Sequence, residues 1–339
     1  MIAILFVTAG ALPLNSQVQA PVNSTWSFQD QNQQNTGYSP QTIINSSNVG
    51  DLSLLWSTHI PGASGSAVVI NKIVYITGGG SIWALDELTG KVVWVDGPGK
   101  TTNLHYSTRV GVTIDNGILY GGTSNNLLVA LDATTGSLVW TSLITQGVVG
   151  SSSAYAGIEA TPLAFQGKLI VGEASGDGGP TGGIRGFVRA FSETSGQLLW
   201  TFYTVPPSLI NATNQAFYGN TWGTNGTHGC DCGGGAVWNV PAVDPTTGVV
   251  YFGTGNPSPA GSLVKVRTPN SQKTDLFTDS IVALNSADGS LIWHFQLTPG
   301  DQRDYDQGMP VQLFTTTING IGTQVVGAGS KNGYYFVVN

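Results

Sequence analysis

Charged side chains are scarce in this chain: only 9% of its 339 residues are Asp, Glu, Lys or Arg. The 12 Lys and Arg residues are scattered along the sequence, and the formal net charge is −7. Nucleic-acid-binding domains concentrate positive charge on one face, and membrane-surface patches need clustered Lys and Arg. The composition therefore argues against a nucleic-acid partner and against a basic membrane-binding patch.

Cysteine is also scarce, with two residues, and no C-x-x-C-H sequence is present, so an attached c-type haem domain is not expected. Helical periodicity is nearly absent, and no apolar run is long and uninterrupted enough to predict a transmembrane helix. Glycine is abundant, with 47 residues, and hydrophobic residues make up 40% of the chain. These values are typical of a globular protein and not of a disordered one.

The first twenty residues, MIAILFVTAGALPLNSQVQA, are apolar in their first half and end on Val-Gln-Ala, which resembles a small-residue cleavage site. This pattern is typical of a secretory signal peptide, although no Lys or Arg precedes the apolar run; a buried strand is the alternative. Sequons that agree with export begin at Asn23, Asn45, Asn211 and Asn225. We therefore expect a signal peptide over 1–20, one folded domain over 21–339, and a periplasmic or extracellular location.

One pattern recurs along the chain: Ala, then Gly six residues later, then Trp four residues after the Gly. It occurs in ALDELTGKVVW, ALDATTGSLVW, AFSETSGQLLW and ALNSADGSLIW, which end at Trp94, Trp140, Trp200 and Trp293. The apolar runs predict two strands, and the tight turn between them requires a Gly that can take a positive φ. The segment VDPTTGVVYFG, around Gly248, is interpreted as a degenerate member with Tyr251 near the Trp place.

Further short strands are expected between these hairpins, in segments such as GVTIDNGILYGGT. Each repeat then forms an antiparallel sheet of about four strands, and sheets repeated every 38 to 60 residues or so predict an all-β fold, a β-propeller. The chain holds roughly five to six such blades. The regularly spaced Trp residues are expected to pack between neighbouring blades.

Against this charge-poor background, the segment TPGDQRDYDQGMP, residues 298–310, places Asp301, Asp304 and Asp306 within six positions. A solvated loop is one interpretation, because Asp and Gly favour turns. The other is a site that binds a hard cation and moves a proton, since both tasks use carboxylate oxygens.

The A-x5-G-x3-W repeat resembles the Trp-docking motif of pyrroloquinoline-quinone (PQQ) dependent alcohol dehydrogenases, an eight-bladed propeller family of the periplasm. GCDCGGGAVWNVPAVDPTTGVVYFGTGNPSP is similar to the central segment of this family, TPGDQRDYDQGMP to its catalytic loop, and SKNGYYFVVN to the strand that follows. The resemblance covers nearly all of the chain after the leader. It implies hydride transfer from an alcohol to metal-bound PQQ, with electrons passed on to an external acceptor such as a cytochrome.

The resemblance implies roles for several cofactor-binding residues. Trp238, in GGGAVW, matches the ring on which the quinone stacks, with core packing as the alternative interpretation. Lys331 in SKNG matches the residue that contacts the quinone oxygens, and Arg109 in STRVGV matches the arginine that pairs with a cofactor carboxylate. Both could instead be surface charges. Thr161, in ATPLAF, is also expected among the cofactor contacts.

The same resemblance implies a metal site for Ca²⁺ or a lanthanide ion. Asn256, in GTGNP, matches an amide ligand, and Asp304 matches both the catalytic base and a ligand. Asp306 matches the additional acid of the lanthanide-using branch, where calcium-using members carry a small residue. Glu173 is the preferred acidic ligand in GEASGDGGPTGGIRG, with Asp177 as the alternative. Ordinary turn residues remain the competing interpretation for Asn256 and the two aspartates.

The sequence departs from the family pattern in several places. The segment TNLHYSTR lacks the adjacent cysteine pair that covers the quinone in many members, and Arg303 replaces a Trp of the catalytic loop. The two cysteines, Cys230 and Cys232, are expected to form a disulfide near the cofactor, whereas a soft-metal site with His228 is the alternative. The chain also stops within a strand-like run, so we expect the propeller to be incomplete at its C-terminus.

Two classes of function follow from these observations. The leading hypothesis is an exported quinoprotein alcohol dehydrogenase that acts on a small alcohol or, given the changed cover over the quinone, on a polymeric one. The alternative is a non-catalytic propeller that binds protein or polymer. Neither hypothesis requires nucleic acid or a membrane span.

Overall fold

The computed structural model describes residues 2–6, 25–107, 109–146, 157–173, 185–205, 233–258, 275–301 and 303–339. The described residues form strands, with one short 3-10 helix, η1 (Val49–Asp51). None of the helical structure in these ranges could span a membrane. The all-β class predicted from the repeat is confirmed.

Four sheets have four antiparallel strands each, in sequential order. The first blade contains β3 (Val68–Ile70), β4 (Ile73–Gly78), β5 (Ser81–Asp86) and β6 (Val92–Asp96). The second contains β7 (Thr113–Asp115), β8 (Ile118–Gly122), β9 (Leu127–Asp132) and β10 (Leu138–Leu143). The third contains β11 (Leu163–Phe165), β12 (Lys168–Gly172), β13 (Phe187–Ser192) and β14 (Leu198–Tyr203). The fourth contains β16 (Ala242–Val243), β17 (Val249–Gly253), β19 (Ser280–Asn285) and β20 (Leu291–Gln296).

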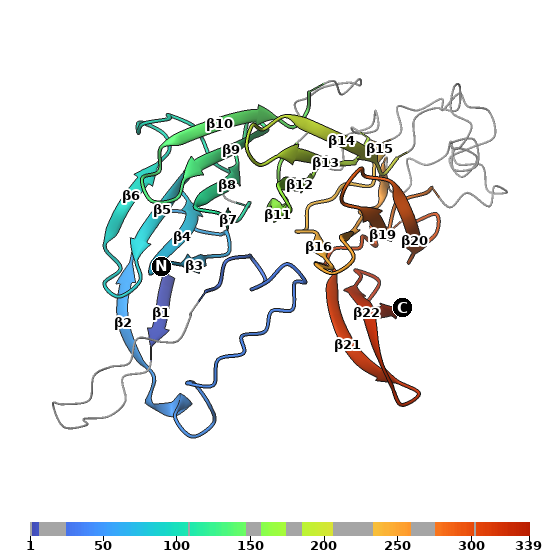
Figure 1. Cartoon of the computed structure of the whole chain (residues 1–339), viewed down its shortest axis with the longest axis horizontal. Coiled ribbons are helices and arrows are strands. Elements are labelled where there is room, and N and C mark those ends of the chain that lie inside the picture. Colours follow the sequence, from blue (N-terminus) through green and yellow to red (C-terminus); the bar gives the residue numbers. More distant parts are fainter. Residues whose placement is uncertain are drawn as a thin grey trace.

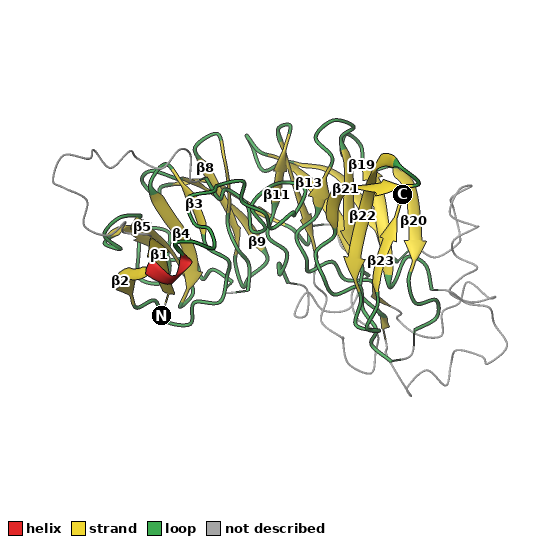
Figure 2. Ribbon diagram, turned by 90° about the horizontal axis from the view of Figure 1, so that it is seen from below, coloured by secondary structure: helices red, strands yellow, loops and turns green. Residues whose placement is uncertain are grey.

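Three smaller sheets complete the described structure. The fifth blade has three strands, β21 (Gln312–Ile318), β22 (Ile321–Gly329) and β23 (Tyr335–Val338). The remaining pairs are β1 (Ile2–Phe6) with β2 (Ser53–Thr58), and β15 (Gly233–Gly234) with β18 (Pro257–Ser258). Figure 1 shows the blades following one another in an arc, with β3, β7, β11 and β16 on its inner side and β6, β10, β14 and β20 on its outer side. Figure 2 shows the same blades standing side by side.

The repeated Trp residues join each blade to the next one, as the sequence predicts. Their indole Nε1 atoms donate to carbonyl oxygens in the next blade: Trp56 to Glu87 at 2.8 Å, Trp94 to Ala133 at 3.0 Å, Trp140 to Glu193 at 2.9 Å and Trp200 to Ser286 at 3.1 Å. The motif glycine of that next blade lies under the ring. At Gly196, for example, φ is +68° and an added Cβ would come 2.6 Å from the Trp140 ring. The motif therefore encodes contact between blades.

The interpretation of VDPTTGVVYFG as a degenerate member of this repeat is wrong. Its turn joins β16 to β17, the first hairpin of the fourth blade and not the last. The ring of Tyr251 packs on Trp293 of its own blade, with 5.8 Å between ring centroids. This first hairpin has the same turn chemistry as the motif hairpins. The Asp244 carboxylate accepts from the residues of the turn, and Gly248 has a φ of +72°. The turn sequence alone therefore cannot distinguish a first hairpin from a last one.

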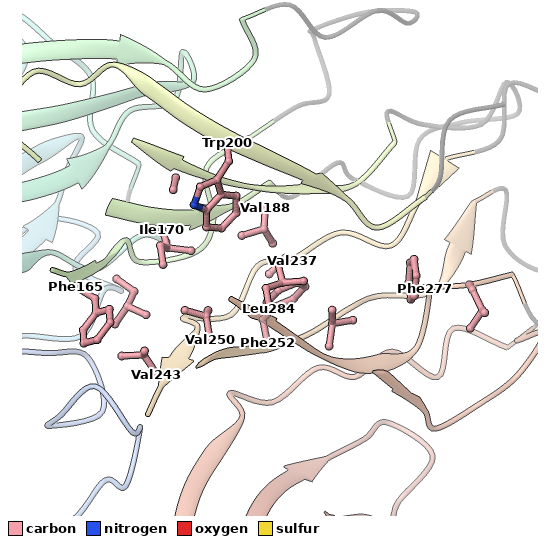
Figure 3. Close-up of a cluster of buried hydrophobic side chains, with 14 residues drawn as sticks. Phe165, Ile170, Val188, Trp200, Val237, Val243, Val250, Phe252, Phe277 and Leu284 are labelled. Carbon is pink, nitrogen blue, oxygen red and sulfur yellow. The ribbon is translucent and has the colours of Figure 1, made fainter. Parts of the chain in front are cut away.

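The hydrophobic core is divided among the blade interfaces. Figure 3 shows one such cluster, in which Ile170 and Trp200 of the third blade face Val250 and Phe252 of the fourth. Val237 belongs to the same cluster and is fully buried. Because Val237 precedes Trp238, this core anchors the segment that carries a predicted cofactor-stacking ring.

A segment that we call the strap, residues 26–36, crosses the inner side of the arc (Figure 1). It starts at Trp26, whose backbone pairs with Val69 of β3 in both directions at 2.8 Å. It ends where the carbonyls of Gln33 and Gln34 accept from the amides of β16 and β21, at 2.8 and 2.9 Å. The strap thus adds backbone hydrogen bonds to the inner strands of the first, fourth and fifth blades.

Candidate functional site

The predicted site residues lie on connections at one end of the blades. Each of these connections leads either into the innermost strand of a blade or out of the strand that pairs with it. Glu173 follows β12, Trp238 precedes β16, Asn256 follows β17, Asp304 and Asp306 precede β21, and Lys331 lies between β22 and β23. Antiparallel pairing brings the start of one strand and the end of its partner to the same edge of a sheet. Residues scattered over about 160 positions are thereby collected at one edge.

Backbone hydrogen bonds tie these connections together in series. They run from the Val237 amide to the Glu173 carbonyl at 2.8 Å, Gly255 to Ala236 at 2.8 Å, Gln307 to Thr254 at 3.2 Å, and Lys331 to Asp306 at 3.0 Å. Each bond joins one site segment to the next around the arc. The positions of the side chains are therefore fixed relative to one another by the main chain.

Asp306 is the centre of the polar cluster and is almost completely buried, with 2% exposure. One of its oxygens, Oδ1, accepts from the backbone N–H of Asn256 at 2.7 Å. The other, Oδ2, forms an ion pair with Lys331 Nζ. The Asn256 side chain donates through Nδ2 to the Pro257 carbonyl at 3.1 Å, which leaves its Oδ1 as the atom suited to a cation.

Asp304 stands at the exposed side of the same cluster. Its Oδ1 is 3.0 Å from Lys331 Nζ, and the two side chains are 50% and 47% exposed. Its backbone is in the left-handed region with φ of +63°, a conformation that Asp tolerates better than most residues. The Asp301 carboxylate holds this turn by accepting from the amides of Arg303 and Tyr305 at 2.8 and 2.6 Å.

The environment separates the protonation of the two acids. Burial raises the pKa of Asp306 to about 6, assisted by the hydrogen bond with Asp304 and opposed by Lys331 and the Asn256 amide. Burial alone would raise the pKa of Asp304, but the hydrogen bonds with Asp306 and Lys331 outweigh this effect, and the pKa is lowered. Burial alone would lower the pKa of Lys331, but its two carboxylate partners outweigh this effect and raise the pKa to about 12. At neutral pH Lys331 is thus a cation held between two acids.

Trp238 lies against this cluster because two glycines leave space for its ring. A Cβ at Gly255 would come 2.5 Å from the indole and 2.9 Å from Asp306 Oδ1. At Gly308 the nearest ring atom would be 4.0 Å away, next to the Lys331 side chain at 3.8 Å. The half-buried ring therefore borders the same space as Asp306 and Lys331, which is the placement required of a stacking platform.

Glu173 is completely buried, directly after β12. Its carbonyl accepts from Val237, so it is joined to the Trp238 segment through the main chain. Within the described ranges, no three His, Cys, Asp or Glu side chains converge as a metal site. A hard cation would therefore draw on the two Asp carboxylates and the Asn256 amide oxygen, with further oxygens from water or a bound group. The oxygen-rich donor set fits such an ion, and Glu173 as a ligand stays a prediction.

Arg109 and Thr161 lie on the neighbouring second and third blades. Arg109 is exposed, and its Nη1 forms an ion pair with Glu159 at 2.7 Å. Thr161 is buried; its Oγ1 accepts from the Gly111 amide at 2.9 Å and donates to Gln29 Oε1 of the strap. Neither side chain contacts the Asp306 cluster directly, and their predicted cofactor contacts stay predictions.

Sequence reasoning did not single out Asp279, which is completely buried at the start of β19. Burial, and the nearby carboxylates of Asp301 and Asp306, raise its pKa to about 9. Its backbone amide donates at 3.0 Å to the carbonyl of Gly255, the residue before Asn256. The available signal was an Asp two residues before the apolar run IVAL, residues 281–284, of a repeat hairpin.

Some predicted features lie outside the described residues. These are Cys230, Cys232 and His228, together with Asp177, the alternative to Glu173. The predicted disulfide and the choice between the two acids therefore stay predictions.

A family profile described as glucose/ethanol/alcohol dehydrogenase, β-propeller domain (PQQ), matches residues 26–339. The dehydrogenase subunit of the quinone-type alcohol dehydrogenase of Gluconobacter oxydans is 35% identical over 321 residues, which is 89% of this chain and 41% of that protein. The quinohemoprotein alcohol dehydrogenase of Comamonas testosteroni is 34% identical over 316 residues, 90% of this chain and 43% of the relative.

Solved structures agree with these matches. The crystal structure of the Comamonas testosteroni enzyme superimposes with a TM-score of 0.78 and 31% identity, covering 93% of this chain and 47% of that one. A europium-containing methanol dehydrogenase gives a TM-score of 0.74 and 25% identity, covering 93% and 56%. The propeller fold is thus confirmed, while the chain spans 41–49% of the length of the curated relatives.

Proposed function

This chain belongs to the PQQ-dependent alcohol dehydrogenase family of β-propellers, and from that premise we propose that it oxidises an alcohol as an exported quinoprotein dehydrogenase. One observation supports the proposal most strongly. Asp304, Lys331, Asp306 and Asn256 form a single hydrogen-bonded cluster, and this cluster borders the ring of Trp238. A flat anionic cofactor and a hard cation need this combination of a stacking surface, a basic side chain and oxygen ligands.

In the proposed arrangement Trp238 would stack on the cofactor and Lys331 would face its oxygens. Asp304, Asp306 and the Asn256 amide oxygen would hold the metal ion. When bound, PQQ supplies an electrophilic carbonyl carbon that accepts hydride, and the cation polarises that carbonyl. The rest of the chemistry falls to side chains of this chain.

Asp304 is the group that would take the proton of the alcohol hydroxyl. It is the more exposed acid of the pair, so it can be reached by substrate. Its pKa is held low by Asp306 and Lys331, which weakens it as a base. Transfer of the Lys331 contact from Asp304 to a bound cofactor would remove one of these interactions and strengthen the base.

The buried Asp306 would decide the preference for the ion. A second carboxylate suits an ion of higher charge and larger coordination number, so we propose a lanthanide ion in preference to Ca²⁺. The solved europium-containing methanol dehydrogenase shows that such ions occur among similar structures. Electrons would pass to an external acceptor of the cytochrome type, since similar proteins are named as quinohemoproteins or as dehydrogenase subunits.

Reconstitution tests the proposal. The purified chain is incubated with PQQ and either Ca²⁺ or La³⁺, and quinone absorbance is recorded after gel filtration, followed by dye reduction with short alcohols. We expect metal-dependent retention of quinone, and a loss of dye reduction of about 100-fold or more in Asp304→Ala. A La³⁺ preference should disappear in Asp306→Ala.

The control is Asp288→Ala, which changes an exposed acid in the turn between β19 and β20 of the fourth blade. It should behave as the unaltered protein does. Absence of retained quinone with both ions, from a folded chain, would reject the dehydrogenase for this chain. It would favour the alternative, a non-catalytic propeller that binds protein or polymer.

A further inference from the structure

The strap ends in a turn that presents one buried amide to two site segments at once. Asn35 is 1% exposed, and its Nδ2 donates to the carbonyls of Val240 and Val311, both at 3.1 Å. Val240 lies two residues after Trp238, and Val311 lies five residues after Asp306. A single side chain therefore connects the stacking segment of the fourth blade with the acid loop of the fifth.

The two residues before Asn35 repeat the connection through their backbone carbonyls. The Gln33 carbonyl accepts from the Val243 amide at 2.8 Å, and the Gln34 carbonyl accepts from the Leu313 amide at 2.9 Å. Two consecutive strap residues thus bond to the inner strands of two different blades. The strap therefore spans the junction between these two blades on their inner side.

The strap is itself held in shape by a local turn. Asn32 Oδ1 accepts from the amides of Gln34 and Thr36 at 3.1 and 3.2 Å, and Asn32 Nδ2 donates to Thr36 Oγ1 at 2.7 Å. Asn35 occupies the left-handed region with φ of +54°, which Asn adopts more readily than most side chains. The Asn32 turn and the left-handed backbone of Asn35 together orient the Asn35 amide towards its two acceptors in the fourth and fifth blades.

We propose that Asn35 is a positioning residue that fixes the Trp238 segment relative to the Asp304–Asp306 loop. Cofactor and metal contacts come from different blades, so a small rotation of the fifth blade against the fourth would separate the stacking ring from its acids. The amide resists that rotation because either carbonyl would lose its donor inside the protein. The effect of Asn35 on cofactor binding rests on the proposed function, whereas its joining of the two segments does not.

Hydrogen exchange measured by NMR or by mass spectrometry with residue-level fragmentation tests the connection without any cofactor. The variant Asn35→Asp keeps the size of the side chain and removes both donors. We expect the amides of Val243 and Leu313, which donate to the strap, to exchange faster together, on the order of tenfold. Strand β9, residues 127–132 of the second blade, is the internal reference and should not change.

The matched control is Asn103→Ala, to be compared with Asn35→Ala. Asn103 has the same φ of +54°, but it is exposed, and its Oδ1 accepts only from the Gly99 amide, at 2.9 Å. Both Ala variants lose the same backbone preference, so any difference reports on the amide contacts. Only Asn35→Ala should accelerate exchange at Val243 and Leu313.

Quinone binding provides the second measurement. In the presence of La³⁺ we expect Asn35→Asp to bind PQQ about tenfold more weakly than the unaltered chain, whereas Asn103→Ala binds it equally well. Faster exchange at only one of the two amides, at neither, or uniformly through β9 would overturn the positioning role. If the unaltered chain binds no quinone, the proposed function fails, and the exchange result still decides whether Asn35 holds the two segments together.

Discussion

At the scale of single residues, the site depends on the absence of a side chain at Gly255. A methyl group there would overlap the Trp238 ring at 2.5 Å and Asp306 Oδ1 at 2.9 Å. We expect Gly255→Ala to displace both groups, to weaken PQQ binding by about tenfold or more, and to lower the free energy of unfolding by about 1–3 kcal/mol. Quinone retention and thermal unfolding measure the two effects separately.

Gly50→Ala is the control for this substitution, because a Cβ at Gly50 meets no atom within 4 Å and its backbone needs no positive φ. It should change neither quantity. Equal quinone retention in Gly255→Ala and the unaltered protein would show that the ring of Trp238 is not part of the binding surface.

Asp279 gives the chain a specific dependence on pH. Its folded-state pKa of about 9 lies above the value of roughly 4 expected in the unfolded chain, so the folded state holds the proton more tightly. The contribution of this group to stability is complete below about pH 4 and is lost as pH rises towards 9. We expect Asp279→Asn to raise the unfolding temperature by a few degrees at pH 8 and to leave it nearly unchanged at pH 4.

Thermal unfolding at the two pH values makes the comparison. Asp288→Asn is the control, since its carboxylate is exposed and its pKa is lowered by hydrogen bonds with Ser290. It should not stabilise the chain at pH 8. An equal shift of Asp279→Asn at both pH values would show that packing, and not the proton, controls the effect.

At the scale of strands and turns, the repeated Trp is the main contact between blades. Trp140, on β10, packs on Gly196 of the third blade and donates to Glu193 there. We expect Trp140→Ala to lower the free energy of unfolding by about 3 kcal/mol, because a large ring is lost from an interface that cannot close around the gap. Chemical denaturation measures the change.

The neighbouring residue supplies the comparison for that experiment. Val139 precedes Trp140 on the same strand but is 50% exposed, so Val139→Ala should change stability by no more than about 0.5 kcal/mol. If both variants cost the same, the repeat would have no special role in joining the blades.

The strands and their pairing could be predicted where local chemistry is specific. The A-x5-G-x3-W pattern predicted the last hairpin of the first four blades, since only Gly fits both the turn and the face of the incoming Trp. The same local chemistry misplaced VDPTTGVVYFG, because a first hairpin can use an identical Asp-Thr-Gly turn. A turn motif reports its own backbone geometry and not its place within a blade.

At the scale of the whole molecule, the sequence predicted which residues share the candidate site better than it predicted how they are held. Trp238, Asn256, Asp304, Asp306 and Lys331 do come together, as their motifs indicated. The ion pair of Lys331 with both acids, the buried Asp279 and the bonds of Asn35 were not predicted. Each depends on contacts between segments far apart in the sequence, and no local pattern records which distant partner a side chain or amide will meet.

The strap also sets an order of events during synthesis. Asn35 leaves the ribosome early, yet its two acceptors lie 205 and 276 residues later in the chain. Contacts of such long sequence separation form late and slow folding, since a large loop must close first. The first blades can assemble before the acceptors of Asn35 have been synthesised. During that time the amides and carbonyls at this end of the strap remain available to water or to a chaperone. The connection made by Asn35 can therefore form only after the fourth blade and the start of the fifth have been synthesised.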